Sequence, residues 1–151
     1  MYSVEEFDRE KTKILKYIMY KKRTENEVRN KFKLTIEENL LEDIIDYLKE
    51  TRYINDYNYI ERFVSECIAL KNLSIKELKY KLYSKGINRH ILDEYIQNNY
   101  EELEEYERKS AENIKIKKQN TMNEEEIKIY LLKKGYKIEN INSAIEQYKD
   151  E

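Results

Sequence analysis

The chain has 151 residues, 40% of them apolar and 40% charged, which suits one compact body or a short string of repeats with a modest core. Its 29 basic and 31 acidic side chains nearly cancel, and this balance excludes a global positive field that would attract nucleic acid. Of the three thirds of the chain, residues 51–100 alone are positive, with 8 basic and 6 acidic side chains. No proline and two glycines favour helices joined by short polar turns over sheets and hairpins.

The spacing of apolar residues at three and four positions predicts nine helices and no sheet. A first repeat, residues 1–52, is expected to hold helices over 4–22, 25–33 and 36–50, with Lys21, Lys22 and Arg23 in the last turn of the first helix, where cations suit the dipole. Residues 53–100 form a second repeat, with helices over 57–70, 75–84 and 89–99. Residues 101–151 form a third, with helices over 101–119, 123–134 and 138–148, the last including Tyr148.

A helix-capping pattern recurs at offsets of 50 and 49 residues. In each copy a side-chain oxygen can accept from a free backbone N–H while a glutamate three residues on reaches back, which is a capping box. The three copies are Thr24 with Glu27, Ser74 with Glu77, and Asn123 with Glu126. Gly86 and Gly135 can take the left-handed conformation that ends a helix, whereas the first copy has no such glycine and must end differently.

A period of this size indicates an array of supersecondary units, each too small to bury its apolar face alone. We therefore predict an all-α fold of three tandem three-helix repeats forming a curved, elongated array, one continuous structural unit. At the first connection, Tyr53 and Ile54 are expected to fill the gap between repeats, and Asp56 to cap the next helix.

The composition leaves little for catalysis. Cys67, the single cysteine, excludes an intramolecular disulfide and a multi-cysteine metal site, and its place on an apolar helix face predicts a buried, inert thiol. His90, the single histidine, has no obvious carboxylate or second ligand at helical spacing and is expected to be a surface or cap residue rather than a catalyst. The carboxylates are expected on solvent faces, with no pair placed for acid–base work. We expect no enzymatic activity, no catalytic residue, no metal and no cofactor.

Targeting patterns are also missing from the sequence. Met1 leads into Tyr-Ser-Val-Glu-Glu, which lacks the basic and then apolar pattern of a secretory signal. No apolar run approaches the roughly 18 residues that span a bilayer. We expect a cytoplasmic monomer without membrane contact.

Residues 71–89 hold six basic side chains and one acid, Glu77, a local charge of +5. With the apolar stripe of this helix facing inward, Lys76, Tyr80 and Tyr83 share its outward face. Aromatics among lysines are typical of a surface that meets phosphate or a protein groove, although a solvated helix face in a tyrosine-rich chain has the same composition. The candidate partner-binding residues are Lys71, Lys76, Lys79, Tyr80, Lys81, Tyr83, Lys85 and Arg89.

The third repeat differs at this position. Ile129 and Leu132 stand where the second repeat has Tyr80 and Tyr83, so the corresponding face is apolar. Such a face can pack on a neighbouring helix or on a partner. We expect packing within the array.

The order of these motifs resembles the RecX family of bacterial regulators of the recombinase RecA. Residues 53–56, Tyr-Ile-Asn-Asp, are similar to the family's Gly-Tyr-Leu-Asp-Asp segment, and residues 77–87 to its Glu-Leu-x-x-Lys-Gly-Ile segment. Residues 131–136, Leu-Leu-Lys-Lys-Gly-Tyr, look like the Leu-x-x-Arg-Gly-Phe of its last repeat. The chain departs from the family where Arg52 replaces a glycine and Asn72-Leu73 replaces Gly-Pro.

The resemblance implies a non-enzymatic protein that lies in the groove of the RecA–DNA filament and curbs its assembly, strand exchange and ATP use, in recombination, DNA repair and the SOS response. Two other classes stay open from the residues themselves. One is a helical module that binds DNA directly through the basic middle repeat, and the other is a protein–protein adaptor. Salt separates filament binding from direct phosphate binding, because the latter falls steeply and log-linearly with salt.

Overall fold

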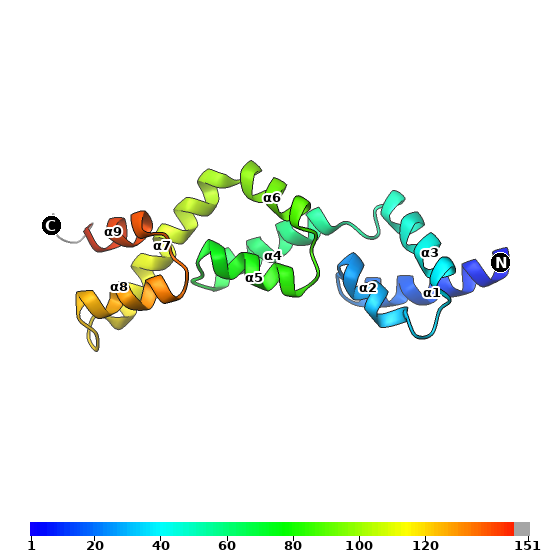
Figure 1. Ribbon diagram of the computed structural model, residues 1–151, viewed down its shortest axis with the longest axis horizontal. Helices are drawn as coiled ribbons and strands as arrows, with labels where there is room; N and C mark the ends of the chain where they lie inside the picture. Colours follow the sequence, from blue (N-terminus) through cyan, green and yellow to red (C-terminus); the bar gives the residue numbers. More distant parts are fainter. Residues whose placement is uncertain (147–151) are drawn as a thin grey trace.

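The computed structural model describes residues 1–146, and all regular secondary structure in that range is helical. Figure 1 shows an elongated molecule in which the helices follow one another in three groups of three. The helices are α1 (Val4–Tyr20), α2 (Glu25–Phe32), α3 (Glu38–Glu50), α4 (Asp56–Leu70), α5 (Ile75–Ser84), α6 (Arg89–Asn98), α7 (Tyr100–Lys118), α8 (Glu124–Lys133) and α9 (Ile138–Glu146). The predicted all-α class and the nine helices are confirmed for these residues, and Tyr148 lies outside them.

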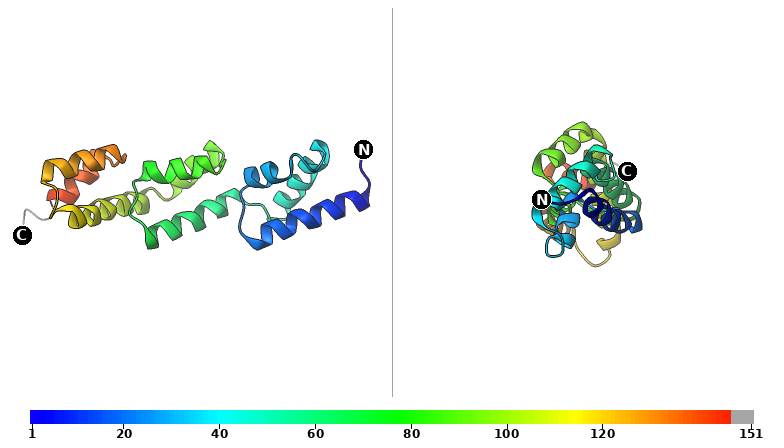
Figure 2. Two further views of the ribbon diagram at one scale, coloured as in Figure 1. Left: turned by 90° about the horizontal axis from the view of Figure 1, so that it is seen from below. Right: turned by 90° about the vertical axis from the view of Figure 1, so that its right-hand side faces the viewer.

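The helices form rows along the molecule. In the left view of Figure 2, the first helices of the three groups, α1, α4 and α7, lie in one row, and the second helices, α2, α5 and α8, lie in another. Because each group repeats the same arrangement, equivalent residues about 50 positions apart occupy equivalent places along the array.

Three apolar clusters hold the array together. The first is built by α1 to α3 and the third by α7 to α9, while the middle cluster of α4 to α6 also takes in Leu103 and Tyr106 of α7. Farther along α7, Ala111 belongs to the third cluster. The long helix α7 therefore packs in two cores, and the division of the chain at residues 52 and 100 stays a prediction.

Several local predictions are confirmed. All three capping boxes form, with their side chains in the predicted roles. Cys67 is buried in the middle cluster and His90 is exposed. The second helix of the first group ends without a glycine, at Phe32.

Other local predictions are wrong. Helix α1 ends at Tyr20, so Lys21, Lys22 and Arg23 follow the helix rather than occupy its last turn. Asn55, not Asp56, caps α4, because the Asn55 side chain accepts from the backbone N–H of Asn58. The carboxylates are not all on solvent faces, since Glu107 is completely buried.

Candidate partner-binding site on α5

Helix α5 carries most of the predicted binding residues, and its own ends are well defined. The Ser74 hydroxyl accepts from the backbone N–H of Glu77 at 3.0 Å, and the Glu77 carboxylate accepts from the N–H of Ser74 at 3.1 Å. At the other end Gly86 has a φ of 78°, and the N–H of Ile87 donates to the carbonyl of Leu82 at 3.3 Å. These bonds form a capping box and a Schellman motif, which fix where the helix begins and ends.

The N-terminus of α5 is also bonded to the third repeat, at what we call the second junction. The Ser74 hydroxyl has a proton to give as well as lone pairs, and it donates to the carbonyl of Lys134 at 2.7 Å. The next backbone N–H, of Ile75, donates to the buried carboxylate of Glu107 at 2.9 Å. One capping serine thus closes its own helix and joins it to the end of α8.

The C-terminus of α5 meets the first repeat in the same way, at the first junction. Thr24, which caps α2, donates its hydroxyl proton to the carbonyl of Lys85 at 2.9 Å. The N–H of Glu25 donates to the Asp56 carboxylate at 2.9 Å. The second helices are therefore joined end to end, and α5 is held at both of its ends.

The two left-handed glycines are part of these junctions. A Cβ atom on Gly86 would lie 2.3 Å from the side-chain nitrogen of Asn26, and one on Gly135 would lie 2.8 Å from Cδ of Lys76. These separations are below any normal contact distance between such atoms. Glycine is thus required at both places for the backbone conformation and for the close approach of the neighbouring repeat.

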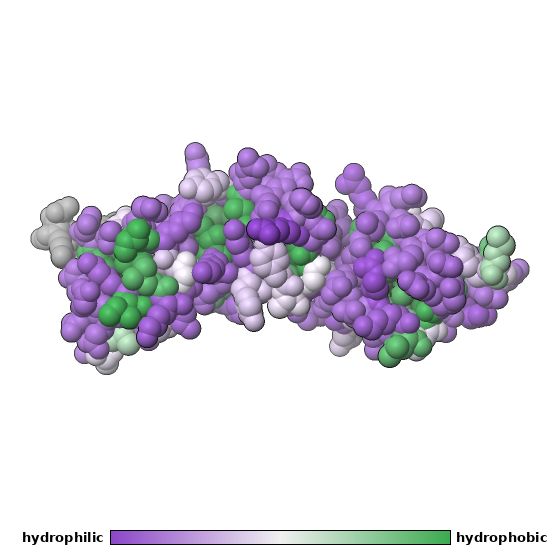
Figure 3. Space-filling model, in the orientation of Figure 1, coloured by the Kyte–Doolittle hydropathy of each residue, from purple (hydrophilic) through white to green (hydrophobic). Residues whose placement is uncertain are grey.

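The outward face of α5 lies between the two junctions. Tyr80 is 75% exposed and Tyr83 is 41% exposed, and Lys76 is exposed beside the second junction. Figure 3 shows the middle of this side of the molecule as mostly hydrophilic to intermediate surface, with smaller hydrophobic areas. The structure therefore brings the three residues predicted for the outward face to solvent, as the helical periodicity indicated.

The remaining predicted residues surround this face less evenly. Lys71 and Arg89 are exposed just outside the helix, and Arg89 lies 3.9 Å from the Asp93 carboxylate. The side chains of Lys79, Lys81 and Lys85 are partly buried, and that of Lys79 borders the middle core. None of the five candidate lysines forms an ion pair within residues 1–146, so their charges can attract an outside anion. These five are Lys71, Lys76, Lys79, Lys81 and Lys85.

Tyr106 of α7 fixes the turn that leads into α5, where the chain has Asn72-Leu73. Its hydroxyl donates to the carbonyl of Lys71 at 2.7 Å and accepts from the N–H of Leu73 at 3.1 Å. Burial raises the pKa of this phenol, which keeps the hydroxyl protonated and able to donate. The turn before the site is therefore set by a buried side chain of the next repeat.

The corresponding face of α8 is apolar and open. Ile129 is 47% exposed and Leu132 is 50% exposed, so the expectation that they pack within the array is wrong. Together with Ile138 at the start of α9 they account for exposed apolar surface over α8 and α9, the region that Figure 3 shows in green at the left. In the described part of the chain these side chains stay about half exposed, as Tyr83 does on the corresponding face of α5.

Two other kinds of site are absent from the described part of the chain. It contains no group of three or more side chains arranged to hold a metal ion. None of its helices combines the length and the apolar composition that crossing a membrane requires. The face of α5 thus presents exposed cations and phenols.

The chain is similar in sequence to known regulatory proteins. No family model matches it. It is 33% identical over 153 residues to the regulatory protein RecX of Clostridium beijerinckii, an alignment that covers 95% of this chain and 70% of that protein. It is 32% identical over 128 residues to the regulatory protein RecX of Finegoldia magna, covering 83% of this chain and 58% of that one.

Two solved structures share the fold. The crystal structure of RecX from Lactobacillus salivarius superposes with a TM-score of 0.83 at 24% identity, covering 99% of this chain and all of that one. A second RecX crystal structure superposes with a TM-score of 0.77 at 23% identity, over 96% of this chain and 73% of that one. Fold and relatives together define a helical regulatory protein. The chain belongs to the RecX family.

Proposed function

We propose that this chain is a non-enzymatic regulator of the recombinase RecA, which binds in the groove of the RecA–DNA filament and inhibits its ATP hydrolysis. Membership of the RecX family supports a regulatory role, and the resemblance described above supplies the recombinase as partner. The proposed site rests on the outward face of α5. There, lysines without an ion pair among residues 1–146 lie beside Tyr80 and Tyr83, on a helix bonded to neighbouring repeats at both ends.

The chemistry of this face fits such a partner. Exposed phenols supply contact area at a small cost in conformational entropy, and cations are attracted to the filament's DNA and to acidic parts of a protein groove. Because both ends of α5 are bonded to neighbouring repeats, the face is preorganised and loses little freedom on binding. The apolar side chains Ile129 and Leu132 lie on the same row of helices and extend the proposed contact surface.

The test is a titration of the protein into RecA filaments formed on single-stranded DNA, with ATP hydrolysis as the readout. The wild type should inhibit, and the double variant Lys76→Glu with Lys79→Glu should need roughly tenfold more protein for the same inhibition. The charge reversal weakens binding because attraction between these lysines and nearby negative charges of the filament becomes repulsion. The effect reaches over a Debye length of about 8 Å in physiological salt.

Two control variants make the result interpretable. Lys76 and Lys79 also pack their aliphatic stems, so Lys76→Met with Lys79→Met removes the charges while keeping most of that packing, and it should fall between wild type and the glutamate variant. Lys13→Glu with Lys16→Glu makes the same change at the same spacing on α1 and should inhibit normally. An inactive wild type would refute the proposed function, and a fully active, folded glutamate variant would move the contact away from α5.

The second candidate function is direct binding of DNA through the middle repeat, and the six basic side chains of residues 71–89 favour it. Salt distinguishes the two. Inhibition that depends on shape and apolar contact persists as salt rises, whereas binding through phosphates alone falls log-linearly. The proposed filament contact predicts a shallow salt dependence.

A further inference from the structure

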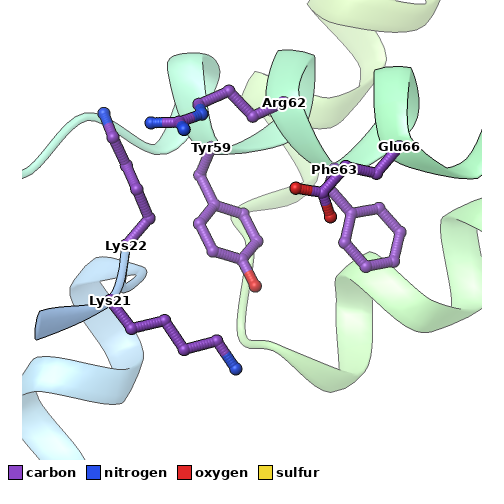
Figure 4. Close-up of a pocket in the computed structure, with 6 residues that line it drawn as sticks. All are labelled: Lys21, Lys22, Tyr59, Arg62, Phe63 and Glu66. Atoms are coloured by element: carbon purple, nitrogen blue, oxygen red, sulfur yellow. The ribbon is translucent and has the colours of Figure 1, made fainter.

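A hollow of about 210 Å³ lies at the first junction, between the end of α1 and the side of α4. Figure 4 shows the six side chains that line it, two from the segment after α1 and four from α4. They are Lys21, Lys22, Tyr59, Arg62, Phe63 and Glu66. The hollow is on a different part of the chain from the α5 face and belongs to the row of first helices.

Three cations and one acid give this hollow a positive charge. Lys22 donates from Nζ to the side-chain oxygen of Asn58 at 2.7 Å, a neutral partner that leaves its charge uncompensated. Lys21, Lys22 and Arg62 form no ion pair among the described residues, and all three are exposed. Such a group of cations around one concavity favours an anionic ligand.

The wall of the hollow is aromatic. The rings of Tyr59 and Phe63 stack with centroids 6.4 Å apart and an interplanar angle of 16°, and both side chains are half-buried. In Figure 4 the ring of Tyr59 stands between Lys21 and Arg62. Burial raises the pKa of Tyr59, with Glu27 and Glu66 adding to the effect, so its hydroxyl stays neutral. A fixed, uncharged ring beside cations can stack on a nucleobase while the cations meet phosphate.

The second junction provides an internal comparison, because a hollow of about 380 Å³ lies there between α4 and α7. Tyr106, Lys109 and Asn113, which line it, follow Tyr59, Arg62 and Glu66 by 47 residues. This second hollow is also lined by Glu102 and Glu105, which outnumber its one lysine. The Tyr106 hydroxyl is already bonded to backbone groups. Repeat architecture alone thus does not require a basic, open hollow at a junction.

We propose that the first-junction hollow binds single-stranded nucleic acid, with a phosphodiester held by Lys21, Lys22 and Arg62 and an adjacent base stacked on Tyr59. The hollow is too small and too open to enclose a free nucleotide, since small-ligand sites bury most of their ligand in about 300–1,000 Å³. A strand gains further contacts beyond the hollow. A duplex keeps its base faces stacked internally and offers none to Tyr59.

The test is fluorescence anisotropy with a labelled single-stranded oligothymidylate in the absence of any recombinase, repeated over a range of salt. The wild type should bind, and Lys21→Ala with Arg62→Ala should weaken binding roughly tenfold at low salt. The slope of log affinity against log salt should fall by about 1.4, or 0.7 for each lost phosphate contact. Tyr59→Leu should weaken binding about fivefold or more, while Tyr59→Phe, which keeps the ring, should bind like wild type.

Lys109→Ala, at the equivalent place in the second hollow, is the matched control and should change neither affinity nor slope. Circular dichroism melting confirms that each variant is folded at the assay temperature. A wild type that does not bind the strand, a double variant with unchanged slope, or Lys109→Ala as weak as the double variant would each overturn the proposal. Equal affinity for a duplex of the same length would overturn its stacking part. Because the recombinase is absent, these outcomes are independent of the ATPase result.

Discussion

The two junctions of the array share the same pattern of hydrogen bonds but differ in how deeply the accepting carboxylate is buried. In each, a capping hydroxyl donates to the carbonyl at the end of the next second helix, and the following N–H donates to a carboxylate of the next first helix. At the first junction that carboxylate is the partly buried Asp56, and a basic hollow stays open beside it. At the second it is Glu107, which is fully buried and also accepts from the N–H of Lys137 at 3.3 Å and from Asn140.

The difference shows what the repeat constrains and what it leaves free. The capping residues and the left-handed glycines recur because both junctions need them. The side chains around these shared residues differ between the junctions. At the second junction α7 belongs to two apolar clusters, whereas exposed cations line a hollow at the first. Helix α5 spans the interval between the two and presents its outward face from a fixed position.

The largest expected effect is at the second junction. Glu107→Leu should destabilise the protein by about 3 kcal/mol, because it leaves buried donors, including the N–H of Ile75, without an acceptor. Asp56→Ala at the first junction should cost about 1 kcal/mol, since water can replace the lost acceptor there. Urea denaturation measures both, with Glu107→Gln as the variant that keeps an acceptor. Equal losses of unfolding free energy for Glu107→Leu and Asp56→Ala would contradict the difference in burial between the two carboxylates.

Next come the capping hydroxyls themselves. Ser74→Ala and Thr24→Ala should each cost about 1–2 kcal/mol, because each removes a cap and a bond between repeats. The exchanges Ser74→Thr and Thr24→Ser keep the hydroxyl and should cost much less. If neither alanine variant moves the denaturation midpoint, the hydroxyls do not hold the junctions.

A gain in stability is expected at the connection before the first junction. Arg52 has a φ of 64°, a left-handed conformation that costs a residue with a Cβ atom and that glycine adopts freely. Arg52→Gly should therefore stabilise the protein by about 1 kcal/mol relative to Arg52→Ala, which keeps the Cβ atom. Thermal melting monitored by circular dichroism gives the difference. A glycine variant no more stable than Arg52→Ala would contradict the proposed cost of the left-handed conformation.

The smallest effect is a pH dependence of opposite sign at the two junctions. Burial raises the pKa of Asp56, although the N–H of Glu25 opposes this, so its carboxylate is destabilised in the folded state. Acidification through this raised pKa should stabilise the wild type relative to Asp56→Asn. Burial also acts to raise the pKa of Glu104, but hydrogen bonds from Lys137 and Asn140 outweigh it and the net pKa is lowered.

The Glu104 contribution is therefore present above the ordinary pKa of a glutamate and is lost as the pH falls through the lowered value. Wild type should lose stability relative to Glu104→Gln on acidification, the reverse of the Asp56 pair. Each change should stay under about 1 kcal/mol, because these groups are partly exposed. Denaturant midpoints from neutral pH to about pH 3 follow both pairs, and the same sign in both would contradict the comparison.

Much of the fold could be predicted from local sequence chemistry. The capping residue, the glutamate three positions on and the terminal glycine act within one helix, so Ser74, Glu77 and Gly86 predicted the bounds of α5 closely. Periodicity also placed Cys67 inside and Tyr80 outside. These features depend on neighbours in sequence, which a single chain displays.

The junctions could not be predicted, because they join groups about 30 to 60 residues apart. Nothing near Glu107 in sequence distinguishes it from the exposed glutamates of α7. Its donors are about 30 residues away, the N–H of Ile75 in the second repeat and the N–H of Lys137 farther along the third. Ile129 and Leu132 lie on the outward side of the row of second helices, as Tyr80 and Tyr83 do, and their apolar character alone wrongly indicated packing within the array. The sequence pattern assigned Lys21 and Lys22 to the last turn of the first helix. It therefore did not indicate that they line the first-junction hollow.

Site-specific photocrosslinking tests most directly whether the outward face of α5 contacts the recombinase, as proposed. A photoreactive phenylalanine analogue at position 80 should crosslink to RecA in filaments on single-stranded DNA. The same analogue in place of Asn30, the exposed residue 50 positions earlier on α2, should not. Crosslinks from position 30 alone, or from neither position while inhibition persists, would contradict the account, and crosslinks from position 80 to DNA instead would favour direct DNA binding.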